Sequence, residues 1–76
     1  MNNSVDIQAL TRCADIVICS IVMNLERVES ELLEHTEAAA RTDNDLLLDR
    51  LFASQVLILE SITKLKIASE LLNLDR

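Results

Sequence analysis

The sequence predicts an all-α fold, an antiparallel two-helix hairpin of the coiled-coil type that completes a bundle with a second chain. Gly and Pro are both absent, so the usual residues of tight turns and β-hairpins are missing. Apolar residues also recur at steps of three and four along much of the chain, which is the period of an amphipathic helix. At 76 residues, we expect one domain, residues 1–76.

The first helix is expected over about residues 4–40. Asn3 or Ser4 can cap its start, and Asp6 favours the positive end of the helix dipole. After Leu33 most large apolar residues disappear, so the helix continues there as a solvated arm or frays. Its main apolar stripe consists of Ile7, Leu10, Ala14, Val17, Ile21, Leu25, Val28 and Leu32.

A link at about 41–44 leads to a second helix at about 43–74. Thr42 is the expected N-cap, with Asp45 in the capping-box position and Asn44 as the residue most tolerant of turn geometry. The main stripe of this helix has gaps at Gln55 and Ser69, and consists of Leu47, Leu51, Ile58, Ile62, Leu65 and Leu72. A second stripe beside it consists of Leu48, Phe52, Val56 and Leu59.

The chain holds more apolar residues than one hairpin buries. Residues 16–23 are apolar except for Ser20, but this run is far shorter than the roughly 20 residues of a membrane span. About six large aliphatic residues left in water would forfeit on the order of 10 kcal/mol, comparable to the stability of a whole domain. We therefore expect a protein partner or self-association, through a contact face of Ile18, Val22, Met23, Phe52, Val56 and Leu59.

Composition and spacing argue against other functions. The net charge of −6 opposes binding to nucleic acid or anionic membrane surfaces. His35 is the single histidine, and with Glu31 it offers two metal ligands, too few for a site. Cys13 and Cys19 point in different directions on a helix, so we interpret them as reduced core thiols. We expect no enzyme activity, no cofactor and, because the start lacks a signal-peptide pattern, a cytoplasmic protein.

The stretch Leu59–Leu72, "LESITKLKIASELL", resembles the second helix of a known family. These are the small co-chaperones of bacterial type III secretion systems, which are similar in size and have two helices with a polar link. The resemblance implies a binding role, in which the hairpin stabilises a larger, tetratricopeptide-like chaperone that keeps the needle subunit unpolymerised. The long apolar block at residues 16–23 departs from the family pattern.

Two functions follow as hypotheses. In the first, the protein is a non-enzymatic co-chaperone whose apolar face docks into a groove of a larger helical partner. In the second, two hairpins pair into a homo-oligomeric four-helix bundle with a structural or regulatory role. Behaviour on expression alone separates them, since a discrete soluble homodimer favours the second, and instability relieved by a co-expressed neighbour favours the first.

Overall fold

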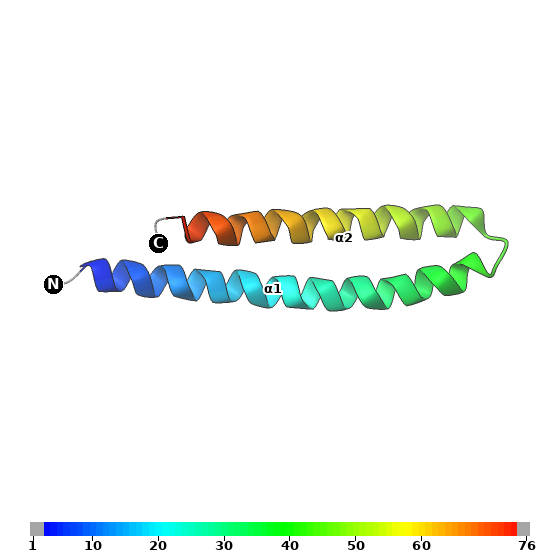
Figure 1. The fold of residues 1–76 in the computed structure, drawn as a ribbon. Coiled ribbons are helices and arrows are strands. Elements are labelled where there is room, and N and C mark those ends of the chain that lie inside the picture. Colours follow the sequence, from blue (N-terminus) through cyan, green and yellow to red (C-terminus); the bar gives the residue numbers. More distant parts are fainter. Residues whose placement is uncertain (1–2, 75–76) are drawn as a thin grey trace.

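The computed structural model describes residues 3–74, with side chains from residue 6 onward, and it confirms the all-α hairpin. Helix α1 spans Asn3–Ala40 and helix α2 spans Asp45–Leu72, and the two lie antiparallel, side by side (Figure 1). The described part contains no strand and measures 65 × 15 × 14 Å. The second chain of the predicted bundle stays a prediction. The expected caps Asn3 and Ser4 involve side chains outside the described residues.

The link places the N-cap of α2 at Asn44, so the prediction of Thr42 with a capping box is wrong. The Asn44 side-chain oxygen accepts a hydrogen bond of 3.0 Å from the backbone N–H of Leu47. Thr42 instead lies just after the end of α1, where its hydroxyl donates to the carbonyl of Ala39 at 2.7 Å. That hydroxyl oxygen also accepts the backbone N–H of Asn44 at 3.3 Å, which joins the end of one helix to the start of the next.

The two helices differ in length. Helix α1 has 38 residues and α2 has 28, with α2 ending at Leu72 rather than near Leu74 as predicted. The N-terminal turns of α1 therefore extend beyond the end of α2 (Figure 1). Ile7 and Leu10 lie in this overhang and are 61% and 70% exposed.

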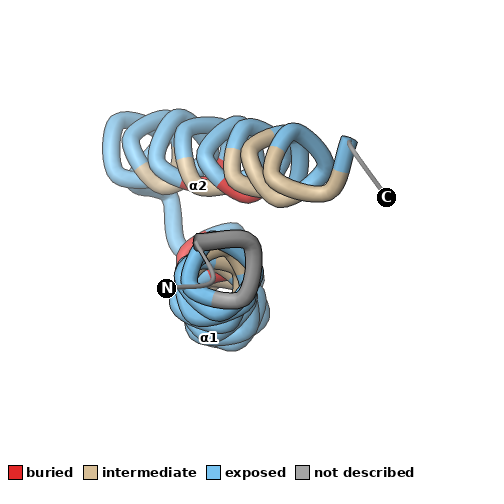
Figure 2. The backbone as a smooth tube through the Cα atoms, turned by 90° about the vertical axis from the view of Figure 1, so that its left-hand side faces the viewer, coloured by how far each residue is buried: buried red, intermediate tan, exposed pale blue. Residues whose placement is uncertain are grey.

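The helices meet along one seam whose residues alternate at steps of three and four, as in a coiled coil. Buried and half-buried residues line the side of α2 that faces α1 (Figure 2). The α1 seam consists of Thr11, Asp15, Ile18, Val22, Leu25, Glu29, Leu32, Thr36 and Ala39. The α2 seam consists of Leu48, Leu51, Gln55, Ile58, Ile62, Leu65, Ser69 and Leu72.

The predicted main stripe of α2 is largely confirmed, with exposed Leu47 replaced by its neighbour Leu48. The predicted stripe of α1 is wrong except for Leu25 and Leu32, because the helix is rotated toward its neighbouring stripe. The members that lie outside the seam and are exposed are Ile7, Leu10, Ala14, Val17, Ile21 and Val28.

Two polar layers explain this rotation. Thr36 Oγ1 lies 3.1 Å from Gln55 Oε1 and 2.9 Å from its own helix's Leu32 carbonyl, and both side chains are buried. Near the other end of the seam, Ser69 and Asn73 both donate to the carboxylate of Asp15, at 2.5 and 3.3 Å. Because a buried polar group without a partner is costly, the gaps in the α2 stripe must face polar residues of α1.

The seam forms a thin core. Its buried hydrophobic residues are Val22, Ala39 and Ile62, and among the described residues no large side chain is fully buried. The accessible surface of 6041 Å² exceeds the roughly 4,700 Å² expected of a compact monomer of 8.5 kDa. The radius of gyration of 17.9 Å likewise exceeds the about 11 Å of a compact chain of this length. This elongated shape leaves many large hydrophobic side chains exposed along both helices.

The cap at Asn44 gives a test of the link. Asn44→Ala should destabilise the hairpin by about 1 kcal/mol, because the N–H of Leu47 loses its acceptor. Thermal unfolding followed by circular dichroism should show a fall in Tm of about 4–8 °C for a chain of this size. The matched control is Asn24→Ala, at an exposed position inside α1, which should leave Tm unchanged or raise it. A larger loss from Thr42→Ala than from Asn44→Ala would contradict the assignment of the cap.

Candidate protein-binding sides of the hairpin

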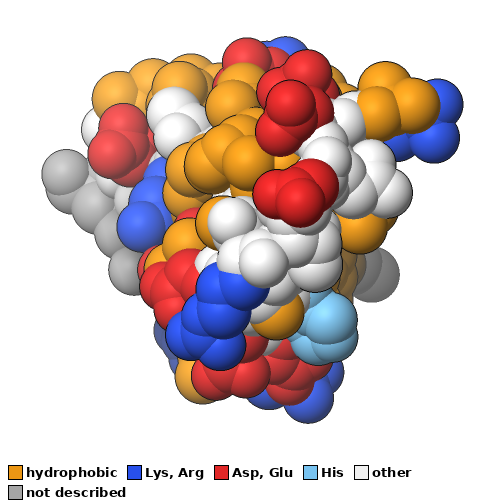
Figure 3. All heavy atoms as spheres, turned by 90° about the vertical axis from the view of Figure 1, so that its right-hand side faces the viewer, with side chains coloured by type: hydrophobic (Ala, Val, Ile, Leu, Met, Phe, Trp, Pro, Cys, Tyr) orange, Lys and Arg blue, Asp and Glu red, His pale blue; other side chains and the backbone are white. Residues whose placement is uncertain are grey.

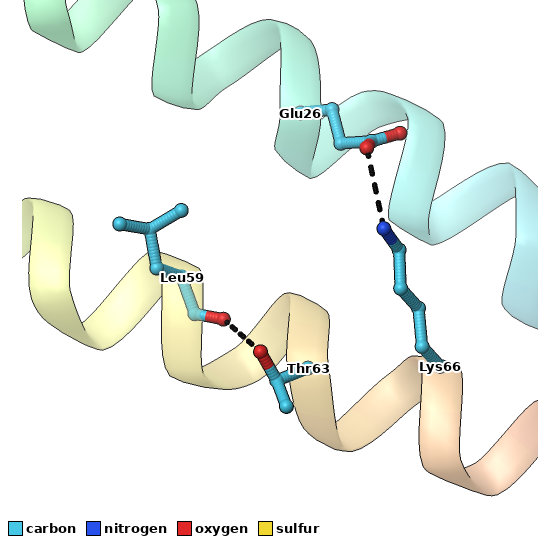
Figure 4. Close-up of polar contacts among 4 residues, drawn as sticks. All are labelled: Glu26, Leu59, Thr63 and Lys66. Carbon is cyan, nitrogen blue, oxygen red and sulfur yellow. Dashed lines mark hydrogen bonds and ion pairs between the residues drawn. The ribbon is translucent and has the colours of Figure 1, made fainter.

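The hairpin has two lateral sides that the seam defines. On each helix, a residue that follows a seam residue lies on one side, and a residue that precedes a seam residue lies on the other. Because the helices are antiparallel, followers from both helices share the same side. Glu26 follows Leu25 and Lys66 follows Leu65, and their side chains form an ion pair of 3.7 Å across the helices (Figure 4). We call this the Phe52 side and the opposite one the Val17 side.

Two open grooves agree with this division. One groove, of about 420 Å³, lies on the Phe52 side, where Cys19 and Met23 of α1 and Lys66 and Glu70 of α2 line it. All four residues follow a seam position. The other groove lies on the Val17 side, and Val28, Glu31 and His35, which precede seam positions, line it. Each side therefore combines side chains from both helices.

The link half of the Phe52 side carries an apolar strip, the Phe52 strip, formed by Leu33, Phe52, Val56 and Leu59. The contact between Thr36 and Gln55 fixes its alignment, since Leu33 lies one turn before Thr36, while Phe52 and Val56 flank Gln55. Seen from the link end, hydrophobic side chains gather over α2, with acidic side chains beside them (Figure 3). The contact between Thr36 and Gln55, together with the ion pair between Glu26 and Lys66, therefore places Leu33 of α1 level with Leu59 of α2.

The structure divides the six residues of the predicted contact face. Phe52, Val56 and Leu59 lie together and are 52%, 53% and 48% exposed. Met23 is on the same side and 70% exposed, but it lies about 20 Å along the axis from the level of Gln55. The expectation that Val22 and Ile18 lack a partner inside the hairpin is wrong, because both are seam residues and Val22 is only 9% exposed.

Leu33 is the strip residue that sequence reasoning missed. It stands where the large apolar residues of α1 become rare, so the periodic pattern no longer drew attention to it. The available signal was its position directly after Leu32, a seam residue, just as Phe52 and Leu59 follow Leu51 and Ile58. Glu26 and Glu37 of α1 and Asp49 of α2 also follow seam residues, so acidic groups border the strip.

A second apolar strip, the Val17 strip, runs along the Val17 side of α1. It consists of Ile7, Leu10, Ala14, Val17 and Ile21, all of them exposed. Its steps of three and four repeat those of the seam, so the strip has the pattern of a second coiled-coil face. No charged residue falls within it.

The chemically reactive side chains are dispersed. Cys13 and Cys19 are free but exposed, so the prediction that they are core thiols is wrong. The ring Nδ1 of His35 lies 2.8 Å from the backbone carbonyl oxygen of Glu31 rather than near its carboxylate. Within residues 3–74, no three His, Cys, Asp or Glu side chains gather in an arrangement suited to a metal ion.

Comparison with family models, curated proteins and solved structures gives no match to this chain. In the described part of the chain, neither helix has the length and apolar character needed to cross a membrane.

Two Val→Asp substitutions should separate the seam from the Phe52 strip. Val22→Asp places an unpaired charge in the seam and should cost about 3 kcal/mol or more, lowering Tm by more than about 10 °C. Val56→Asp makes the same change at a half-exposed position and should shift the stability of the lone chain by about 0.5 kcal/mol or less. Thermal unfolding of both variants checks this. Equal losses of Tm would mean that the two valines do not differ in burial.

Proposed function

We propose that the protein is a non-enzymatic, cytoplasmic protein-binding subunit that acts as a co-chaperone. It stabilises a larger helical chaperone and so helps to keep a type III secretion needle subunit soluble. The observation that carries the proposal is the Phe52 strip, in which four large apolar side chains lie exposed together on a hairpin that is already formed. Isolated exposed apolar residues are common, whereas a contiguous strip marks a binding surface.

The strip suits a helical groove with a basic rim. Burying the exposed half of each of its four side chains contributes about 1 kcal/mol per residue, or about 4 kcal/mol in all. A micromolar Kd needs roughly 8 kcal/mol. Polar contacts must supply the remainder. The acidic groups Glu37 and Asp49 beside the strip favour a partner that carries Lys or Arg around its groove.

The resemblance to the co-chaperone family and the Phe52 strip have one residue in common. Leu59 belongs to the strip and also opens the stretch "LESITKLKIASELL" on which the resemblance rests. The same stretch supplies Ile62, Leu65 and Leu72 to the seam, so it both holds the hairpin together and presents part of the binding surface. Hairpin formation and partner binding therefore depend on a common segment.

A homo-oligomeric structural or regulatory role is the second candidate. The observation that favours it is the Val17 strip, which lies on the other side of the hairpin and is as exposed as the first. Because the two strips lie on opposite sides of the hairpin, a substitution in one strip leaves the apolar surface of the other strip unchanged.

The test is co-expression of this chain with the larger chaperone and the needle subunit that the proposal assigns to it. Leu59→Asp should abolish co-purification of both partners and leave the needle subunit insoluble, since the charge would enter a dry interface. The matched control is Leu57→Asp, which makes the same change at an even more exposed position, on the Val17 side. This control should retain the complex.

Far-UV circular dichroism of each variant alone verifies that the hairpin is intact, because neither leucine lies in the seam. Co-purification that survives Leu59→Asp, or is lost equally with Leu57→Asp, would exclude the Phe52 strip as the docking surface. A needle subunit that is equally soluble with and without this protein would reject the co-chaperone role itself.

A further inference from the structure

The Val17 strip fits a second copy of the same chain. Its outer residues, Ile7 and Leu10, lie on the part of α1 that extends beyond α2, so another helix can approach them without obstruction from α2 (Figure 1). Its inner residues, Val17 and Ile21, are 58% and 42% exposed. The strip thus offers about four helical turns of apolar surface to one partner helix.

The order of residue sizes in the strip is self-complementary for antiparallel pairing. Coiled-coil layers can form in two antiparallel registers that keep strip residues opposite each other. In one register Ala14 lies opposite Leu10 of the second copy, and in the other it lies opposite Val17 of the second copy. Either way the small Ala14 meets a larger side chain, whereas a parallel pair in register would place the two alanines opposite each other.

Charge favours the same orientation. Residues 26–58, which form the link half of the hairpin, contain eight acids and three bases, a net charge of −5 out of the total −6. A parallel pair would place the two acidic link halves side by side. An antiparallel pair places them at opposite ends, far beyond the screening length of about 8 Å at physiological ionic strength.

The uncovered surface also matches such a contact. The chain exposes about 1,300–1,400 Å² more than a compact monomer of its mass, whereas a standard interface covers about 800 Å² on each partner. One contact of that size leaves about 500–600 Å² of the excess uncovered. The uncovered surface is therefore large enough for a contact on the Val17 strip in addition to one on the Phe52 strip.

We propose that two copies of this chain pair their α1 helices antiparallel through Ile7, Leu10, Ala14, Val17 and Ile21. The pairing uses the side opposite the Phe52 strip, so it does not rest on the co-chaperone role, and it gives a geometry to the homo-oligomer proposed as the second candidate. It leaves the Phe52 strip of each copy open at opposite ends of the dimer.

Adjacent residues provide a matched pair of variants. Val17 and Ile16 are 58% and 59% exposed but lie on opposite sides of the hairpin. Sedimentation equilibrium of the full chain should give twice the 8.5 kDa chain mass. Val17→Asp should raise the dimer Kd at least about tenfold, because it places a charge in an apolar contact. Ile16→Asp should leave the Kd within about twofold, and circular dichroism should show both variants folded.

The two cysteines report the geometry directly. Both are free and exposed, but Cys13 lies beside the Val17 strip and Cys19 lies on the far side of α1 from it. In both registers the two copies of Cys13 come within about 8 Å along the axis, whereas two helix diameters of about 20 Å separate the copies of Cys19. A bis-maleimide shorter than that separation should link the variant Cys19→Ser, which keeps Cys13, into a covalent dimer. It should leave the variant Cys13→Ser, which keeps only Cys19, unlinked.

A chain that stays monomeric at hundreds of micromolar would overturn the pairing. So would a dimer that Ile16→Asp weakens as much as Val17→Asp does, or one that is cross-linked through Cys19 instead of Cys13. These outcomes are independent of whether Leu59→Asp releases the chaperone partner, so failure of the dimer and failure of the proposed function can be distinguished.

Discussion

The pairing of polar residues inside the seam determines what the rest of the hairpin presents to its surroundings. Thr36 contacts Gln55 near the link, and Asp15 accepts hydrogen bonds from Ser69 and Asn73 near the termini. Sliding α2 along α1, or rotating α1 about its axis, would leave the buried Thr36 and Gln55 without each other and would break the hydrogen bonds of the half-buried Asp15. Polar residues at seam positions commonly define register at some cost in stability. Here they turn Val22 inward and leave Val17 and Phe52 outside.

Much of the fold was predictable from the sequence, because two long helices and a short polar link follow from periodicity and from the absence of Gly and Pro. The rotation of α1 about its axis was not predictable from the sequence. Its apolar block holds two neighbouring stripes with the same period, one through Val17 and one through Val22, and periodicity alone does not choose between them. The gaps at Gln55 and Ser69 held the missing information, since only the Val22 stripe contains the polar residues that face them.

The candidate site was predictable on α2 and only in part on α1, for the same reason. Phe52, Val56 and Leu59 stand beside a stripe that was assigned correctly to the seam, so their exposure follows. On α1 the wrong choice of stripe exchanged seam residues for surface residues, which moved Ile18 and Val22 into the contact face and left Leu33 out. The N-cap failed on a smaller scale, because Thr42 and Asn44 can both cap a helix and the contact with Ala39 decides between them.

A seam this thin links folding to binding. Without a fully buried large side chain among the described residues, the lone hairpin has little stability to lose, and each covered strip would add to it directly. A partner on the Phe52 strip and a second copy on the Val17 strip use opposite sides, so neither competes with the other. Each of these partners would still stabilise the same seam. The strip residues lie within two positions of a seam residue, except on the part of α1 that extends beyond α2. A partner that binds only the folded hairpin would raise the folded fraction available to a partner on the other side, and this coupling is large only where the unfolded chain is populated.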